Sequence, residues 1–391
     1  MAIASGQRTT GNIGSSQRKI DMHKEILLLE PDAGPLLQIS KSMSRQRASD
    51  PLFSWHNDAA EQRFDAVNNG AGYADNATSI VVDTGTAFAK HFLVYVPRTG
   101  ELLQVDSVST NTLTVDRGVG GSTAAALVDN DPLLIVGVAG EEGDASEAPR
   151  SENPTKVDNY TQIFKTSVQS SATLLSSANE SNPHDWRHQQ KKKMIEHKKD
   201  IEYAFLVGKP GTQTGPNGLP QRSTGGILHY AAVNRTAVGG ALTLVEVESW
   251  LATLFRYGSN KKTVFVSSNV LAALNMHALN KLQTVSGTST FGVSVMNWVS
   301  AFGEIKLVHH HLLEGAILGG YAIAIDFAGG AVAYRYLHGE GAPGGSRDTH
   351  IEEDVISDVD GRRDEIITEC GLQAGLPYVH GVLTGSDGTV A

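Results

Sequence analysis

The sequence predicts an α+β protein with a small β-rich domain inserted in its first half. Three observations lead to this prediction. Short runs of β-branched and aromatic residues crowd residues 76–139, a long helical stretch begins near residue 182, and strands joined by glycine-rich loops fill the last third. The stretch after residue 210 alternates helical and strand patterns, which indicates a further α/β region.

Length and charge narrow the class of protein. A chain of 391 residues is long enough for two or three domains, each with its own core. Lys and Arg number 32 against 42 Asp and Glu, so the net charge of -10 disfavours the phosphate backbone and any nucleic-acid contact must be local. The single cysteine, Cys370, excludes an internal disulfide framework, fits a reducing cytosol and leaves no cysteine cluster for zinc.

The N-terminal region predicts an arm rather than an export signal. Residues 1–20 are polar and rich in Gly and Ser, without an apolar core for a signal peptide. Residues 26–55 mix apolar clusters with prolines and have little periodicity, which indicates a segment that packs against another part of the structure. We expect a flexible arm followed by this packing segment.

One apolar stretch, Gly315 to Tyr334, imitates a membrane span. Asp326 within it would cost roughly 2.5 to 3.5 kcal/mol at a bilayer centre. Glycine pairs at 319–320 and 329–330 also divide the stretch into pieces of strand length. We therefore predict strands and no membrane contact.

The β-rich runs at 76–139 are "TSIVVD", "HFLVYVP", "ELLQVDSV", "NTLTVDRG" and "PLLIVGVA". Their close spacing, with Gly, Asp and Asn between them, predicts a compact antiparallel sandwich or barrel. Residues 140–159 carry acids and two prolines and predict a loop. The alternating "YTQIFKTSVQSS" that follows predicts a long exposed strand.

The long helix is expected to begin with Asn182 as N-cap, Pro183 at the first position and Asp185 in the first turn. Gly208 and Pro210 should end it. Helical periodicity places one stripe on Trp186, Gln190, Met194, His197, Ile201 and Phe205. The opposite side carries Arg187, Lys191, Lys192, Lys198 and Lys199, with Lys193 near the apolar stripe.

The lysine cluster raises a question of nucleic-acid binding. Glu196 lies at helical spacing from Lys192 and Lys199, so part of the charge should be compensated within the helix. No aromatic residues interleave with the lysines, and no groove-reading helix pair is evident. The pattern favours a solvated or inter-subunit face over dedicated DNA recognition.

A second helix is predicted within "TLVEVESWLATLFRYG". Thr243 and Glu246 form a capping box, Gly258 provides the stop, and the apolar face comprises Val247, Trp250, Leu251, Leu254 and Phe255. A strand "TVFVS", a short helix at about 268–279 and strands around 291–299 and 304–310 should follow.

Motifs of catalysis are weak or missing. The chain has no G-x-S-x-G and no G-x-x-x-x-G-K-[ST] pattern, and "GVGGS" at 118–122 precedes no helix. "DVISDVDGRRDEI" fails as a calcium loop because Ile356 and Ile367 occupy its first and twelfth positions.

The best metal candidate lies in "VHHHLLE". His309 and His311 would share one face of a strand, and Glu314 follows closely. The pattern favours surface or interface histidines of a His-rich chain over a metal site, because no third ligand nearby in the sequence is compelling. We therefore assign no catalytic, cofactor-binding or metal-binding residue.

Several segments together resemble the major capsid proteins of tailed bacteriophages, which share the Hong Kong 97-type fold. They are "PLLQI" and "DPLFSW", "TLTVDRGVGGSTAAAL", "DPLLIVGVAGEEG", the strand leading into a basic helix, and "RDEIITECGLQAGLPYVHGVLTG". Within that superfamily the chain is most similar to the group of the phage SU-ten major head protein, over Ile26 to Gly385. The resemblance implies an α+β Hong Kong 97-type capsid fold with an inserted small β-rich domain.

The resemblance also implies a division of the chain into five parts. They are an N-arm at 1–50, an extended loop at 51–75 and 140–175, an inserted β-domain at 76–139, a peripheral domain with the spine helix at 176–210 and 313–370, and an axial domain at 211–312 and 371–391.

By the same resemblance, the chain is expected to be a structural, non-enzymatic major capsid protein that self-assembles as hexamers and pentamers. These would close into an icosahedral shell around double-stranded DNA, in the virion, after assembly in the host bacterial cytoplasm. Scaffold, portal and decoration proteins are the expected partners, DNA contacts are expected to be weak and non-specific, and no cofactor is expected. No local motif identifies a lysine–asparagine cross-link, so we predict non-covalent stabilisation.

Other classes of protein remain open from the residues alone. The β-rich segment would also suit a surface or carbohydrate-binding β-protein, although no export signal accompanies it. A metal-dependent enzyme would use His309, His311 and Glu314. A DNA-binding protein would use Lys191 to Lys199, and its affinity would depend strongly on salt.

Overall fold

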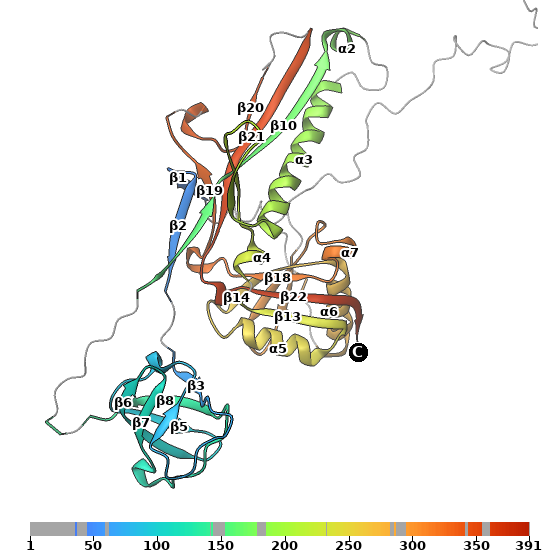
Figure 1. Cartoon of the computed structure of the whole chain (residues 1–391). Helices are drawn as coiled ribbons and strands as arrows, with labels where there is room; N and C mark the ends of the chain where they lie inside the picture. Colours follow the sequence, from blue (N-terminus) through green and yellow to red (C-terminus); the bar gives the residue numbers. More distant parts are fainter. Residues whose placement is uncertain are drawn as a thin grey trace, which may run out of the picture. The chain divides into compact units, whose positions relative to one another are not determined.

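The computed structural model describes residues 36, 45–58, 62–140, 142–143, 153–177, 185–231, 233–281, 285–286, 295–340, 343–353 and 360–390. The chain divides into two compact units (Figure 1), a small one at Asp58–Thr155 and a larger one formed by the rest of the chain. Helices and strands are mixed in the larger unit and strands dominate the smaller, which confirms the predicted α+β class.

The smaller unit is a six-stranded antiparallel sheet in the order β3-β8-β5-β6-β7-β4. Its strands are β3 (Phe64–Ala66), β4 (Ser79–Val81), β5 (Phe92–Val96), β6 (Glu101–Ser109), β7 (Thr112–Asp116) and β8 (Pro132–Val138), with short 3-10 helices at Gly85–Ala87 and Val119–Gly121.

The two outer strands of this sheet also meet each other. The amide of Asn68 donates to the carbonyl of Val81 at 2.9 Å, and the amide of Asp83 donates to the carbonyl of Ala66 at 3.1 Å. These bonds close the sheet into a barrel around a core that includes Val94. The unit is wider than the expected 76–139 because β3, which precedes residue 76, pairs with β8.

The larger unit contains a sheet of long strands beside the longest helix (Figure 1). β10 and β21 pair antiparallel over ten residues, from Gln162 opposite Cys370 to Ser171 opposite Gly361. The elements here are β1 (Arg45–Ala48), β10 (Gln162–Ser171), α2 (Ala172–Ser176), α3 (Asp185–Val207), β19 (Val332–Leu337), a 3-10 helix at Pro343–Gly345, β20 (His350–Glu352) and β21 (Gly361–Ala374). A separate ribbon pairs β2 (Leu52–Asn57) with β9 (Thr155–Tyr160).

A seven-stranded sheet in the order β13-β22-β18-β14-β17-β16-β15 forms the second half of this unit. Its strands are β13 (Arg235–Leu242), β14 (Lys261–Val266), β15 (Val285–Ser286), β16 (Val295–Val299), β17 (Glu304–His309), β18 (Ala322–Ile325) and β22 (Gly381–Val390). The remaining elements are the hairpin β11 (Gly211–Thr214) with β12 (Pro220–Ser223), the helices α4 (Ile227–Tyr230), α5 (Leu244–Leu254), α6 (Ser268–Lys281) and α7 (Gly315–Leu318), and 3-10 helices at Ala328–Gly330 and Pro377–Val379.

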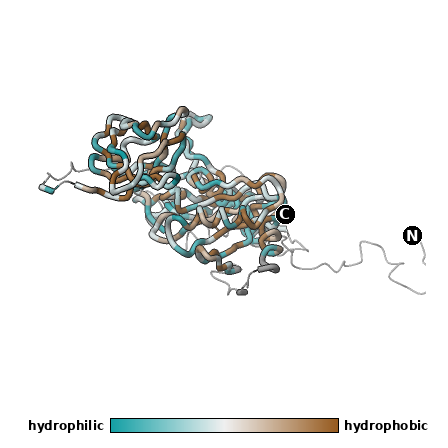
Figure 2. The backbone as a smooth tube through the Cα atoms, turned by 90° about the horizontal axis from the view of Figure 1, so that it is seen from below, coloured by the Kyte–Doolittle hydropathy of each residue, from teal (hydrophilic) through white to brown (hydrophobic). Residues whose placement is uncertain are grey.

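The two faces of the seven-stranded sheet are buried by different elements, as the alternation along β14 illustrates. Val264 and Val266 pack in a core with α5 and α6, whereas Phe265 points into a second core with α3, α4 and Tyr334. Figure 2 shows hydrophobic and hydrophilic stretches alternating along the described backbone. Of the described helices, none is both long and apolar enough to cross a membrane.

Local sequence signals predicted several elements correctly. The capping box at α5 is present, since the Thr243 side chain accepts from the Glu246 amide and the Glu246 carboxylate accepts from the Thr243 amide. Gly258 takes a left-handed φ of +86° after the helix. The stretch Gly315 to Tyr334 contains α7, the whole of β18, a 3-10 helix and the first three residues of β19 rather than a single span.

Some predictions lie outside the described residues. These are Asn182 and Pro183 at the start of α3, the arm before residue 45 except Leu36, and residues 354–359 of the rejected calcium loop. The described part of α3 begins at Asp185 and ends at Val207, immediately before the expected stop at Gly208.

Candidate functional site

The long helix α3 is attached to the β10–β21 pair by polar side chains along much of its length. Gln190 Nε2 donates to Asp364 Oδ2 at 2.6 Å, and Asp364 is buried. Further along, the His197 ring lies between two hydroxyls, with Thr166 Oγ1 2.9 Å from Nδ1 and Thr368 Oγ1 2.8 Å from Nε2. These bonds satisfy polar groups that would otherwise be buried beneath the helix without a hydrogen-bond partner.

The last turns of α3 enter the apolar core. Ile201, Phe205 and Leu206 are buried there, as the predicted stripe required for the first two. Next to Ile201, Glu202 is fully buried, although glutamate is rarely buried without a partner and its burial was not predicted.

The burial of Glu202 is explained by its hydrogen bonds. Its Oε1 accepts from the backbone amide of Leu36 at 2.8 Å and lies 2.6 Å from His310 Nε2. The Leu312 amide donates to His310 Nδ1 at 3.2 Å, so the proton of a neutral ring is on Nε2 and is donated to Glu202. One carboxylate oxygen thus links α3, the end of β17 and the N-terminal segment.

The basic face of α3, defined as Arg187, Lys191, Lys192 and Lys198, is exposed as predicted. Lys199 is half-buried. Glu196 accepts from Lys193 Nζ at 2.6 Å, an intrahelical pair in addition to those expected with Lys192 and Lys199. Residues three apart on a helix lie side by side, and Lys193 is half-buried next to Glu196.

The histidine cluster after β17 is split between the surface and the core. His309 and His311 lie on the same side as predicted, with ring centroids 4.7 Å apart, and His309 Nε2 is 2.9 Å from Glu314 Oε1. His310 between them is buried. Glu314 also accepts from the amide and hydroxyl of Ser268. Within the described ranges, no group of three or more His, Cys, Asp or Glu side chains is arranged to hold a metal ion.

A buried lysine was missed by sequence reasoning. Lys262 Nζ donates to the carbonyls of Tyr257 at 2.9 Å and Val379 at 2.7 Å, and lies 3.5 Å from Asp326 Oδ2. Burial lowers the pKa of Lys262, while the nearby Asp326 carboxylate opposes this shift. Beside them His380 is buried, and burial lowers its pKa to about 4.

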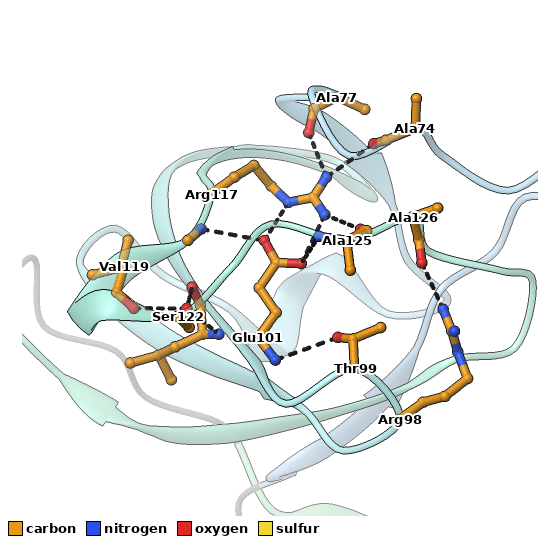
Figure 3. Close-up of polar contacts among 12 residues, drawn as sticks. Ala74, Ala77, Arg98, Thr99, Glu101, Arg117, Val119, Ser122, Ala125 and Ala126 are labelled. Carbon is orange, nitrogen blue, oxygen red and sulfur yellow. Dashed lines mark hydrogen bonds and ion pairs between the residues drawn. The ribbon is translucent and has the colours of Figure 1, made fainter.

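Figure 3 shows a second buried ion pair, among the loops at one end of the barrel. Arg117 uses all five of its N–H donors there. Nε and Nη2 donate to the two carboxylate oxygens of Glu101 at 2.7 and 2.8 Å, and the remaining N–H groups donate to the carbonyls of Ala74, Ala77 and Ala125.

The Glu101 carboxylate is equally well satisfied. It is fully buried and accepts from the backbone amides of Gly118 and Ala125 as well as from Arg117 (Figure 3). Burial raises the pKa of Glu101, but the Arg117 guanidinium and the two amides outweigh burial, so the pKa is lower than usual. The pair fixes three loops at one end of the barrel.

Comparisons with known proteins identify the family of the chain. The family model described as SU10 major capsid protein matches residues 4–387. A major capsid protein of Pseudomonas phage PaMx41 is 27% identical over 287 residues, which are 69% of this chain and 67% of the relative.

Solved structures are also similar at low identity. The capsid of a native GTA particle is 9% identical with a TM-score of 0.47, over 96% of this chain and 98% of that one. The holo-SrpI encapsulin complex of Synechococcus elongatus is 17% identical with a TM-score of 0.44, over 61% of this chain and 78% of that one.

The family match covers both compact units, the barrel as well as the larger unit, and it defines the class as a shell-forming structural protein of phage particles. The chain belongs to the SU10 major capsid protein family. Its α+β fold places the long helix α3 beside the strands β10 and β21 and has a barrel inserted in the sequence between β2 and β9.

Proposed function

We propose that the chain assembles as pentamers and hexamers that close into an icosahedral shell around double-stranded DNA. The observation that carries this proposal is the family match over residues 4–387, which leaves almost none of the chain for a different role. We further propose that assembly takes place in the host bacterial cytoplasm and involves scaffold, portal and decoration proteins. The role is structural, without catalytic chemistry.

The construction of the subunit supports assembly with neighbours. The β2–β9 ribbon buries Phe53 and Trp55 within the subunit but leaves Leu52 on the same strand exposed. Exposed large apolar side chains, including Ile163 on β10 and Ile351 on β20, recur over the larger unit. Head-to-tail contacts between such copies generate closed rings when the rotation between neighbours closes.

The five-part division of the chain is proposed in the same terms. The N-terminal segment is the arm, and the segments before and after the barrel form an extended loop that includes β10. The helix α3 belongs to the peripheral domain, and the seven-stranded sheet forms most of the axial domain. Its strand β18 lies within 313–370, the segment expected in the peripheral domain. The separate core of the barrel supports its assignment as an inserted domain, whereas α3 and the seven-stranded sheet share one core, so the peripheral and axial parts pack directly together.

The basic face of α3 is proposed to meet acidic groups of a neighbouring subunit or the packaged DNA. Four exposed cations on one helix would give an attraction that ignores DNA sequence, because phosphate contacts carry no base information. Such contacts would allow a shell to package DNA of any sequence.

Electron microscopy of the expressed full-length chain tests the proposal. Shells, tubes or rings of five and six subunits are expected, and a protein that stays monomeric when a scaffold is supplied would refute it. The particles should dissociate to single chains on a denaturing gel, since we propose non-covalent stabilisation. Ladders of covalent multimers would contradict that part.

A further inference from the structure

The seven-stranded sheet has two ends whose chemistry differs. β13, β14, β17 and β22 all begin at one end, and the antiparallel strands β16 and β18 finish there. The loops at this end therefore lie side by side although they are far apart in sequence. Figure 1 marks the C-terminus, which follows β22, at the opposite end of the sheet.

Exposed large apolar side chains gather at the first end, which we call the tyrosine end. Its six members, Val233, Tyr257, Val299, Phe302, Leu376 and Tyr378, are each between 40% and 57% exposed. The rings of Tyr257 and Tyr378 meet edge to face with centroids 6.2 Å apart. Tyrosine in such rigid surroundings is the side chain most typical of interface hot spots.

The tyrosine end is held rigid from beneath. Lys262 Nζ binds the carbonyl oxygens of Tyr257 and Val379, so one buried cation joins two of the loops. Asn234 Nδ2 donates to the carbonyls of Tyr378 at 2.6 Å and His380 at 3.0 Å, which joins a third loop. A surface organised before binding loses less conformational entropy when a partner docks.

The exposed charge at the tyrosine end is positive. Arg256 and Lys261 are exposed there, with the Arg256 guanidinium over the Tyr257 ring at 5.4 Å. Lys261 is ion-paired with Glu304 at 3.3 Å and Asp326 is buried, so the net exposed charge of these loops is positive through Arg256.

The opposite end, which we call the acidic end, complements this charge. Its segments 242–248, 266–270, 309–321 and 386–391 contain no Lys or Arg. They carry Glu246, Glu248, Glu314 and Asp387. They also carry exposed apolar side chains at Val245, Ile317 and Val390.

From this complementarity we infer that the tyrosine end of one subunit docks on the acidic end of a second copy of the chain. The contact joins two different surfaces of the same chain, so it is head-to-tail and generates a ring when the rotation closes. Apolar side chains face apolar side chains, and cations face carboxylates. The inference rests on the proposed ring-forming function and assigns the surfaces that form the ring.

Cysteine cross-linking of the full-length chain tests the contact. The chain's own Cys370 is buried, so a new pair, Tyr378→Cys with Ile317→Cys, can be joined by a short bis-maleimide linker. We expect the double variant to give a ladder of covalent oligomers on a denaturing gel. Each single variant should stay monomeric, because a head-to-tail contact brings unlike surfaces together.

The outcomes separate this inference from the proposed function. A double variant that forms shells or rings but gives no ladder overturns the inference and leaves the proposed function standing. Covalent dimers of the Tyr378→Cys variant alone also overturn the inference, because they indicate that two tyrosine ends meet across a two-fold axis. A wild-type chain that forms no oligomers at all removes the proposed function and the inference together.

A matched pair of substitutions provides a second measurement. Tyr378→Ser removes a ring from the tyrosine end, whereas Tyr203→Ser removes a ring of similar exposure, 41%, from α3. We expect Tyr378→Ser to raise the protein concentration needed for assembly at least tenfold and Tyr203→Ser to change it less than twofold. Equal effects of the two substitutions would overturn the inference, and unchanged thermal unfolding of both verifies that the subunits are folded.

Discussion

Replacing Arg117 with methionine should destabilise the barrel without touching the rest of the subunit. Methionine fills a similar volume but removes all five N–H donors. Glu101 would then keep only the amides of Gly118 and Ala125 as donors in a site that water does not reach. Three backbone carbonyls would lose their Arg117 partner in the same step.

The magnitude follows from the burial of both partners. The Arg117 and Glu101 side chains are 6% and 0% exposed, so solvent cannot replace the lost ion pair. Removing one partner of a buried pair costs about 3 to 5 kcal/mol. Since each 1.4 kcal/mol is tenfold in an equilibrium constant, the open state of the barrel should become about 140 to 3,700 times more populated.

Amide hydrogen exchange of the full-length chain measures this population directly. Peptides from β5, β6 and β7 should exchange faster in the variant by the same factor, up to the limit set by complete unfolding, while peptides from α5 should not change. The effect should be constant at neutral pH and should shrink as the pH falls below 4.5, the usual pKa of a glutamate. The pKa of Glu101 is lowered in the wild-type fold, so its stabilisation is present above the usual pKa and is lost as the pH falls through the lowered value.

Two substitutions control the interpretation. Arg98 pairs with Asp131 on the same barrel but is 44% exposed, so Arg98→Met should cost less than Arg117→Met. Replacing Arg117 and Glu101 together with methionine should recover much of the loss, because no charge is then left buried. An Arg117→Met variant with wild-type exchange in β5 to β7 would refute the reasoning.

Three further predictions follow from the larger unit. Replacing the three exposed lysines of the basic face with glutamine should reduce the yield of shells or of nuclease-protected DNA. The midpoint of thermal unfolding should change by no more than a few degrees. A much lower midpoint, or normal particles filled with DNA, would contradict this prediction. Glu202→Leu should lower the free energy of unfolding, measured in urea, by about 2 to 5 kcal/mol. Glu202→Gln should lower it less, because the amide still offers an oxygen to Leu36 and His310. The reverse order would show that these hydrogen bonds are unimportant. Burial lowers the pKa of His380 from about 6.5 in the unfolded chain to about 4 in the fold. The contribution of His380 to stability is therefore full above pH 6.5 and is lost as the pH falls towards 4, by about 3 kcal/mol in all. His380→Asn should flatten the pH dependence of the free energy of unfolding, and an unchanged slope would contradict the assignment.

Local signals in the sequence predicted the elements whose stability is local. The capping box at Thr243 and Glu246 is specified by residues three apart, and it forms as expected at α5. The stripe on α3 follows from a period of 3.6 residues, and it placed Ile201 and Phe205 in the core correctly.

Long-range features could not be predicted in the same way. The periodicity of the β-runs left a sandwich and a barrel equally open, because the closing bonds join Asn68 to Val81 and depend on the twist of the whole sheet. The burial of Lys262 could not be predicted, because the sequence is equally compatible with an edge strand. The two carbonyls that bind its ammonium group lie 5 and 117 residues away in the sequence. Glu202 likewise acquires its partners only when Leu36 and His310 arrive from 166 and 108 residues away.

Charge sets different salt dependences for the two proposed contacts. A subunit with a net charge of -10 repels DNA as a whole, and four exposed cations on the basic face would release at most about four counterions, a slope of roughly -3 to -4 in log affinity against log salt. Binding of that kind is weak for one subunit and becomes effective only when a closed shell presents many copies at once.

The contact between the tyrosine end and the acidic end depends mainly on apolar side chains, which salts such as sulfate strengthen. Sulfate should therefore weaken the attraction to DNA while shells remain intact, as measured by electron microscopy together with release of nuclease-accessible DNA from opened particles. If the shells dissociate at a lower salt concentration than the one that releases DNA, ion pairs rather than apolar contacts hold the ring together.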